Sequence, residues 1–191
     1  MISVKTDNPP GRTPAQPLVR QILGLTTSFR EAQDRLYLAA QDDAGQVTGL
    51  WLTRRLADRL VRKLTARLDG AGHAAQAPTP SRAAVQVWQQ SVAQAQHARV
   101  APVPEPAPTS EALIESVDIA QADGRLRLVF HCAGGRSLGL TVDGTQLRQW
   151  LGMVYRNYRV AEWATEGVWP AWFGEAATQS FAPPAPGLLV H

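Results

Sequence analysis

Residues 35–68 read RLYLAAQDDAGQVTGLWLTRRLADRLVRKLTARL, and this stretch decides the fold class. Two short runs of strand-forming residues, 35–39 and 47–52, flank a turn that contains Asp and Gly, which is the pattern of a β-hairpin. Thr53 follows and can cap a helix. The next segment has a leucine at every fourth position: Leu56, Leu60, Leu64 and Leu68. The stretch therefore predicts a hairpin that runs directly into an amphipathic helix.

A second stretch repeats this order. Residues 114–120, 125–132 and 136–142 each favour a strand, and Asp- or Gly-containing turns separate them. Asp143 can cap the helix that follows. The expected apolar stripe of that helix consists of Leu147, Trp150, Leu151, Val154 and Tyr158. A strand over 21–30 completes the same pattern in the first stretch, since it precedes the hairpin.

The two stretches can be aligned, which suggests an internal duplication. Leu36 and Leu38 then match Leu126 and Leu128. If the second turn is slightly shorter in the second copy, Leu50 and Leu52 match Leu138 and Leu140. A coincidental likeness is the alternative, because a hairpin followed by a helix is a common arrangement. The agreement in order, turn positions and caps favours the duplication.

The expected fold is α+β, with two pseudo-repeated antiparallel β-sheet-plus-helix units joined by a bridging helix and a Pro-rich spacer. A short further helix is expected over 160–166, after the second unit. The expected segments are a flexible arm (1–17), the first β-hairpin/helix unit (18–72), the bridging helix (80–98), the Pro-rich spacer (99–110), the second β-hairpin/helix unit with an aromatic C-terminal extension (111–175) and a Pro-rich tail (176–191).

The bridging helix has its own apolar stripe. Ser81 can cap it, and the residues that follow are good helix formers. The stripe is narrow and consists of Val85, Trp88, Val92 and Ala95.

The residues that usually carry catalysis or bind metals are scattered. The four histidines, at 73, 97, 131 and 191, lack the clustered spacing of a metal site. No nucleophile-elbow pattern occurs, and the pair Asp42–Asp43 is placed in a turn, where aspartate bonds the local backbone. Gly70 to Ala75 follows a helix rather than a strand, so it is no dinucleotide fingerprint. We therefore expect no enzyme, no cofactor and no metal site.

The amino-acid composition says more about the cellular location of the chain than about what it binds. No apolar run approaches the roughly 20 residues that a membrane-spanning helix needs, so no membrane association is expected. Cys132 is the only cysteine, which excludes an intramolecular disulfide and suits a reducing cytoplasm. The net charge is only +3, so the distribution of charge is more informative than its sum.

The first helix has a basic face opposite its leucines. The candidate residues on this face are Arg55, Arg59, Arg62, Lys63 and Arg67. Such a stripe can bind phosphates or an acidic protein surface, and the third interpretation is a face that contacts only solvent. The aromatic interleaving typical of single-strand binders is missing from this helix.

Aromatic residues are concentrated near the C-terminus. The candidate interaction residues among them are Trp163, Trp169, Trp172 and Phe173. They can cover the core of the second unit or serve as interface anchors. No Lys or Arg follows Arg159, whereas Glu162, Glu166 and Glu175 do. This predicts contact between the basic helix and the acidic aromatic region, either within one chain or between two.

These observations favour a non-enzymatic interaction protein: an assembly, adaptor or scaffold component of a larger cytoplasmic complex, with a protein partner or self-association into an oligomer. The alternative is a nucleic-acid-binding accessory protein that uses the basic face of helix 53–68. A small enzyme with a site between the two units is the third interpretation.

Overall fold

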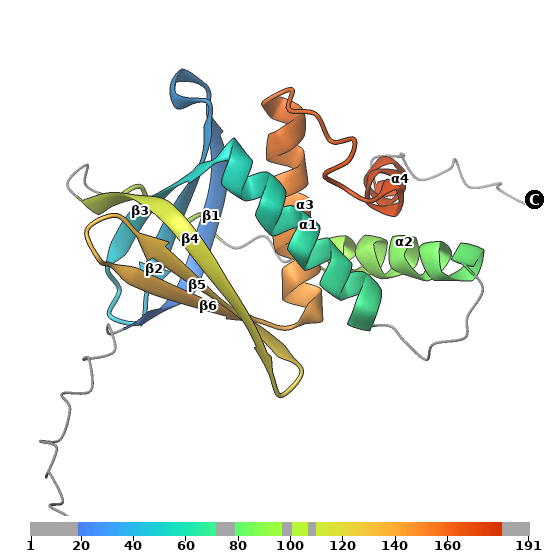
Figure 1. Cartoon of the computed structure of the whole chain (residues 1–191), viewed down its shortest axis with the longest axis horizontal. Coiled ribbons are helices and arrows are strands. Elements are labelled where there is room, and N and C mark those ends of the chain that lie inside the picture. Colours follow the sequence, from blue (N-terminus) through green and yellow to red (C-terminus); the bar gives the residue numbers. More distant parts are fainter. Residues whose placement is uncertain (1–18, 72–78, 97–100, 107–109, 181–191) are drawn as a thin grey trace, which may run out of the picture.

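The centre of the computed structural model, which describes residues 19–71, 79–96, 101–106 and 110–180, is a closed barrel of six strands (Figure 1). The strands are β1 (Arg20–Arg30), β2 (Arg35–Asp42), β3 (Val47–Thr53), β4 (Glu111–Ala122), β5 (Arg125–Cys132) and β6 (Ser137–Val142). The α+β class and the expected strands are confirmed. The arm 1–17, most of the tail and parts of the spacer lie outside the described residues.

The strands of both stretches belong to one barrel. β1, β2 and β3 form an antiparallel sheet, and β4, β5 and β6 form another. Parallel pairing of β3 with β4 and of β1 with β6 joins the two sheets at both edges. Closure removes the free edges that would otherwise present unpaired backbone groups to other chains.

Leucines fill the barrel because side chains alternate between its two faces. Leu36 pairs with Leu52 and Leu38 with Leu50, and all four are at most 1% exposed. β5 and β6 contribute equivalent pairs, and Phe130 of β5 is fully buried. The period-two pattern in the sequence therefore placed the interior residues correctly.

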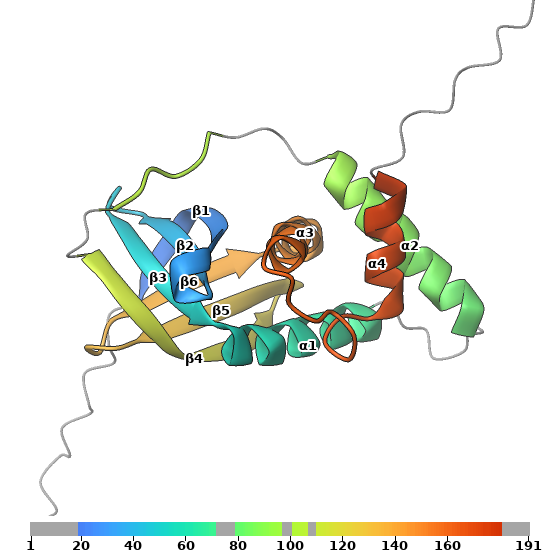
Figure 2. The same cartoon turned by 90° about the horizontal axis from the view of Figure 1, so that it is seen from above.

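The described residues form four helices, which lie on one side of the barrel (Figure 2). They are α1 (Arg54–Ala71), α2 (Thr79–Ala95), α3 (Gly144–Val160) and α4 (Ala171–Ser180), and a short 3₁₀ turn, η1 (Glu31–Gln33), links β1 to β2. Figure 2 shows α3 between the barrel and the pair α2–α4, with α1 running along one side. None of the described helices is long and apolar enough to cross a membrane.

The two helices that follow the sheets begin at the expected caps. The backbone N–H of Leu56 donates to Thr53 Oγ1 at 3.3 Å, and that of Gln146 donates to Asp143 Oδ1 at 2.8 Å. The expected helix over 160–166 is wrong, because α3 continues to Val160 and turns follow it. Glu162 has a left-handed φ of 53°, which ends the helical path there.

The bridging helix is present as α2 (Thr79–Ala95), but its apolar stripe is not its buried face. Val85 and Trp88 are 49% and 66% exposed, whereas Gln86 and Gln90 are buried. Gln86 Nε2 donates to the carbonyl of Leu68 at 3.1 Å, and Gln90 Nε2 donates to the carbonyl of Arg148 at 2.9 Å. The glutamine side chains occupy the inward face of α2 because their amides donate to buried backbone carbonyls, which apolar side chains cannot do.

The hairpins β2–β3 and β5–β6 have equivalent strand registers. Leu38 pairs with Leu50, and Leu128 pairs with Leu140. Leu50 therefore corresponds to Leu140, and its expected match with Leu138 is wrong. No shorter turn is needed, because the turns that follow β2 and β5 are closed by equivalent backbone bonds, Asp42 N–H to Gln46 and Cys132 N–H to Arg136.

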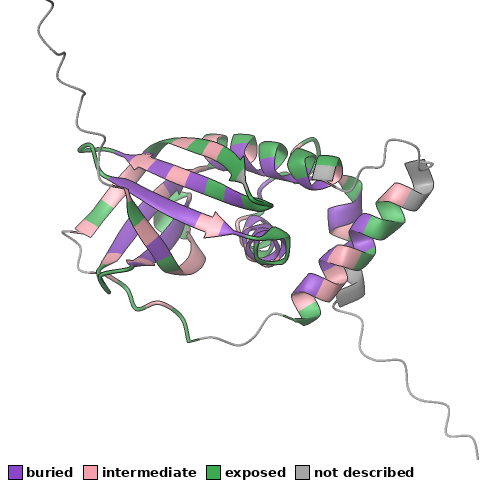
Figure 3. Ribbon diagram, turned by 90° about the horizontal axis from the view of Figure 1, so that it is seen from below, coloured by how far each residue is buried: buried purple, intermediate pink, exposed green. Residues whose placement is uncertain are grey.

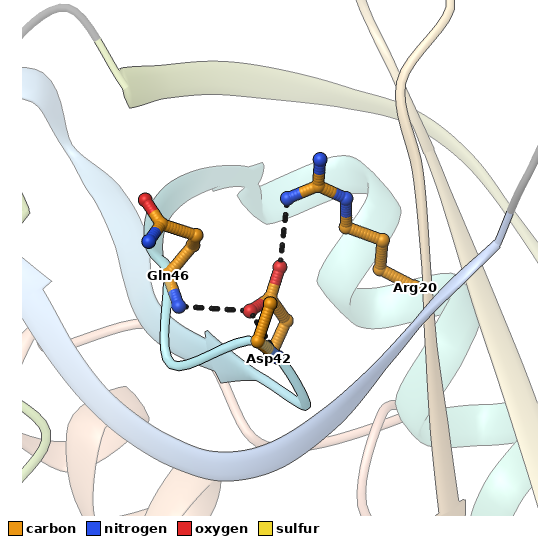
Figure 4. A network of polar contacts seen from close by, with 4 residues as sticks. Arg20, Asp42 and Gln46 are labelled. Atoms are coloured by element: carbon orange, nitrogen blue, oxygen red, sulfur yellow. Dashed lines mark hydrogen bonds and ion pairs between the residues drawn. The ribbon is translucent and has the colours of Figure 1, made fainter.

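The turn after β2 is built on a buried carboxylate. Asp42 is 3% exposed and accepts hydrogen bonds from the N–H groups of Ala44 and Gln46 and from Arg20 Nη1, at 3.0, 2.8 and 3.0 Å (Figure 4). Burial raises the pKa of Asp42, but these hydrogen bonds outweigh it and hold the pKa below its ordinary value. The expected turn role of this residue is confirmed.

Residues 101–106, the described part of the Pro-rich segment, lie along β1. They have no regular secondary structure. The N–H of Val103 donates to Thr26 Oγ1 at 2.8 Å, and Arg30 forms an ion pair with Glu105. This segment therefore covers part of the outer face of the barrel.

Candidate interaction surface

The five basic residues singled out on the first helix share one exposed face of α1. Arg55, Arg59, Arg62, Lys63 and Arg67 are all exposed. The ion pairs of the described residues, Arg20–Asp42, Arg30–Glu105 and His131–Asp118, involve none of them. At 1.5 Å per residue the face runs for about 18 Å along the helix. α1 therefore presents a row of positive charge that has no carboxylate partner in the described part of the chain.

The opposite face of α1 is held against the core. Leu60, Val61, Leu64 and Leu68 are at most 6% exposed. Figure 3 shows buried and exposed residues alternating along α1, in keeping with one inward and one outward face. Because the inward face is fixed in this way, the basic side chains project from a rigid support.

The four aromatic candidates lie in the core of the chain. Trp163, Trp169 and Trp172 are 5–7% exposed, and Phe173 is fully buried. Trp169 and Phe173 also contact each other with their ring centroids 4.7 Å apart. Of the two interpretations left open by the sequence, packing inside the chain accounts for where these rings lie. A role as anchors for a partner stays a prediction.

Aspartates accept hydrogen bonds from Tyr158, Trp163 and Trp172 of this region, whereas Trp169 Nε1 is buried without a hydrogen-bond partner. Tyr158 Oη donates to Asp58 Oδ1 at 2.8 Å, and Trp172 Nε1 donates to Asp69 Oδ1 at 3.0 Å. Burial, reinforced by the Asp58 carboxylate, raises the pKa of Tyr158 far above its ordinary value. The tyrosine is therefore a permanent donor at physiological pH.

The predicted contact between the basic helix and the aromatic region exists within the chain, but through other residues. Both acids of α1, Asp58 and Asp69, bond the aromatic residues. Arg54 lies over the ring of Trp163, with its Cζ 5.7 Å from the ring centroid. None of the five residues of the basic face forms one of these hydrogen bonds or ring contacts, although the charge of Arg62 acts on Tyr158.

A Ser–His–Asp cluster that the sequence did not predict lies on β4, β5 and β6. His131 Nδ1 is 3.0 Å from Ser137 Oγ, and its Nε2 is 2.8 Å from Asp118 Oδ2. The side chain of Asp118 is 76% exposed, whereas Ser137 is 6% exposed. A nucleophile must be open to substrate, and here the hydroxyl is the covered end, so the cluster has the arrangement of a cross-strand network.

A second cluster on the outer face of the barrel centres on Glu111. Tyr37 Oη and Trp51 Nε1 donate to its carboxylate oxygens at 3.1 and 3.0 Å. Burial and the Glu111 carboxylate raise the pKa of Tyr37 to about 12. Gly49 lies beneath this tyrosine, and a Cβ there would be 2.2 Å from Tyr37 Oη. The ring can occupy this position only because residue 49 has no side chain.

Arg148 of α3 is buried without a carboxylate ion pair, and the sequence did not single it out. It is 6% exposed, and its Nη2 donates to the amide oxygens of Gln86 and Gln89 at 2.5 and 2.6 Å. Its Nη1 is buried and has no hydrogen-bond partner. Burial lowers the pKa of Arg148, and the charge of Asp69 acts in the opposite direction.

Gly152, one turn after Arg148 in α3, was the one sequence feature that could have indicated this contact between α2 and α3. A Cβ at Gly152 would be 2.9 Å from Gln94 Nε2. The glycine leaves room for the Gln94 and Gln90 side chains of α2, in the same contact between α2 and α3 in which Arg148 is buried.

Within the described residues, no group of three His, Cys, Asp or Glu side chains is arranged to hold a metal ion. The one cysteine, Cys132, is buried in β5 with a free thiol.

No protein-family model matches the chain, and neither the curated proteins nor the solved structures include a significant match.

Proposed function

We propose that this chain is a non-enzymatic interaction protein that binds an acidic partner through the basic face of α1. The observation that carries the proposal is the exposure of five like-charged side chains on one helix face, with none of them in an ion pair of the described residues. An acidic protein surface within a larger complex is the partner that we favour. A cytoplasmic location is part of the same proposal.

Local electrostatics support a role for this face in binding. Arg55, Arg59, Lys63 and Arg67 follow one another at four-residue spacing, so neighbouring charges repel along the helix. An acidic partner would relieve this repulsion on binding. Since the inward face of α1 is anchored in the core, the partner would not need to order the helix first.

Nucleic acid is the second candidate partner. The basic face is rich in Arg and about 18 Å long, a length that can follow several backbone phosphates. The described residues place no exposed aromatic ring within the face itself, so this candidate predicts binding to backbone charge without preference for sequence.

Self-association is a third form of the proposal. Glu162, Glu166 and Glu175 are exposed around the buried aromatic residues. The basic face of one chain could meet this acidic surface of another. The expected oligomer would dissociate as salt is added, because exposed charge pairs are screened.

The experiment is capture of partners from the native cell with the full chain, followed by the mass of the recovered complex. Arg59→Glu/Arg62→Glu reverses two charges of the basic face. Arg125→Glu/Arg127→Glu is the matched control, because it makes the same change at two exposed positions of β5. We expect the first variant to lose the partner and the control to retain it.

Nuclease treatment and the mass of the purified chain distinguish the three candidate partners, which are an acidic protein, nucleic acid and a second copy of the chain. Loss of the complex on nuclease treatment favours nucleic acid, and a purified chain that is oligomeric at low salt favours self-association. Equal capture by the wild type and both variants would contradict the proposal, since the basic face would then be dispensable.

The internal duplication remains part of the proposal. With the register described above, Arg35, Leu36 and Leu38 match Arg125, Leu126 and Leu128, and the first strands are both irregular at the same place, after Ile22 and after Ile114. The further identical pairs are Gly45 with Gly135, Gly49 with Gly139 and Leu50 with Leu140. In this view the basic face belongs to one copy only, because α3 has no equivalent row.

A further inference from the structure

The structure holds a second feature that the proposed function does not use, a groove between α2 and the start of α3. Its volume is about 530 Å³, within the range of small-molecule sites. We propose that this groove binds a small organic anion with a planar apolar body, and that the anion pairs with the buried guanidinium of Arg148.

Both polar and apolar residues line the groove. Arg148 and Gln89 form part of its lining, together with Gly144 and Thr145 at the first turn of α3. Trp88 and Val92 of α2 line it as well, and Trp88 is 66% exposed. An exposed indole beside an arginine offers a flat face and a charge to the same ligand.

The guanidinium is left incompletely paired. Arginine stays protonated in proteins, and buried charges are ordinarily paired with opposite charges. Here two neutral amide oxygens bond Nη2, Nη1 has no partner, and the further contact is with the ring of Trp172, whose centroid is 5.6 Å from Cζ. An anion in the groove would supply the missing charge.

Gln89 lines the groove together with Arg148 and is bonded to its guanidinium. It is half-buried, lines the groove and accepts from Nη2 at 2.6 Å. A ligand carboxylate can replace this amide oxygen once the Gln89 side chain turns aside. The first turn of α3 adds N–H groups that favour an anion, because they lie at the positive end of the helix dipole.

Two carboxylates limit the ligand's charge. Asp143 lines the groove and is exposed, although its Oδ1 accepts from the N–H of Gln146. Asp69 lies close enough to Arg148 to influence its pKa. A singly charged ligand such as an aromatic carboxylate therefore fits better than a phosphate.

The test is titration of the full chain with 2-naphthoate, followed by ¹H–¹⁵N NMR. We expect saturable shifts at the amides of Gly144 and Thr145 and at the indole N–H of Trp88. The neutral analogue 2-naphthylmethanol should bind at least tenfold more weakly. Shifts confined to other parts of the chain, or equal binding of both compounds, would overturn the proposal.

Gln89→Glu is the decisive variant, because it brings a carboxylate to Arg148 from within the chain. We expect it to raise the melting temperature and to weaken 2-naphthoate binding at least tenfold. Gln33→Glu, the same change at an exposed position of η1, should alter neither quantity. Trp88→Ala changes an exposed residue and should weaken binding about fivefold without loss of folding. Unchanged binding by Gln89→Glu would show that the guanidinium does not hold the anion.

Discussion

Three aspartates fix the aromatic core at the scale of single residues. Asp58 and Asp69 of α1 accept from Tyr158 and Trp172, and Asp34, directly before β2, accepts from Trp163 Nε1 at 2.8 Å. Each contact joins residues about 100 positions or more apart in sequence. The aspartates therefore orient rings that apolar packing alone would position less uniquely.

Asp42 gives a prediction about acid stability. Asp42→Asn keeps an acceptor in the turn but removes the charge that bonds Arg20, so we expect a loss of about 1–2 kcal/mol at neutral pH. The folded-state pKa lies below the ordinary 3.8, so the contribution of Asp42 is complete above that value and is lost as the pH falls through the lower, folded value. Chemical denaturation between pH 7 and pH 2.5 measures it.

Asp43 is the matched control for this prediction, because it is the next residue in the same turn and is exposed. Asp43→Asn should change stability by less than about 0.5 kcal/mol. If both variants behave alike, the buried carboxylate is not what stabilises the turn.

Gly49 gives a second prediction at this scale. Gly49→Ala places a methyl group 2.2 Å from Tyr37 Oη, and the tyrosine is 4% exposed and bonded to Glu111. We expect a loss of about 1–3 kcal/mol from overpacking. Gly70→Ala in α1 should have the opposite sign, a gain of up to about 1 kcal/mol, because nothing lies within 4 Å of a Cβ there. Thermal unfolding of both variants measures these effects. Destabilisation by Gly70→Ala would contradict the predicted difference in sign.

At the scale of elements, α1 combines a buried leucine face with a self-repelling basic face. Arg59→Glu would replace two repulsive four-residue pairs, with Arg55 and Lys63, by attractive ones. At about 0.2–0.5 kcal/mol for each pair, we expect the free chain to gain about 1 kcal/mol while it loses its acidic partner. Denaturation with and without added salt measures this, because salt should reduce the gain.

Arg59→Gln separates the two effects in this experiment. It removes the repulsion without adding attraction, so about half of the gain is expected. A destabilised Arg59→Glu chain would mean that Arg59 makes a contact that the fold needs, and the proposed role of the face in partner binding would then require a different variant.

Most elements could be predicted from the sequence, because their signals are local. The alternation of Leu36, Leu38, Leu50 and Leu52 and the caps Thr53 and Asp143 each depend on a few neighbouring residues. Barrel closure could not be predicted in this way, because parallel pairing joins distant strands and has no sequence signal of its own.

The candidate sites were predictable to different degrees. The exposure of the basic face followed from the leucine period of α1, since the opposite face of an amphipathic helix meets solvent. The sequence pattern did not predict which face of α2 is buried, because Gln86 and Gln90 face inward through hydrogen bonds to carbonyls of α1 and α3. Arg148 was not predicted for the same reason, because its partners, Gln86 and Gln89, lie on a different helix.

At the scale of the whole molecule, one core joins both halves of the chain. Leu38 and Leu50 from the first half and Leu128 and Phe130 from the second lie in the same buried cluster. Each half taken alone would expose its share of the barrel interior and the strand edges that now pair in parallel.

Separation of the halves gives the corresponding prediction. We expect residues 1–100 and 101–191, made as separate chains, to unfold or self-associate, and to regain cooperative unfolding as a 1:1 complex when mixed. Circular dichroism and light scattering measure this. A monomeric, cooperatively folded half would contradict the single core, because a half would then be a domain.

Site-specific photo-crosslinking in the native cell tests whether the proposed partner binds at the basic face of α1. Ala66 is exposed between Lys63 and Arg67, so a photoreactive residue there would lie within the face. Gln121 on β4 is an exposed control position. We predict a discrete adduct from position 66 that disappears in the Arg59→Glu/Arg62→Glu background, and none from position 121. No adduct at 66, or the same adduct from both positions, would show that the basic face is not where the partner binds.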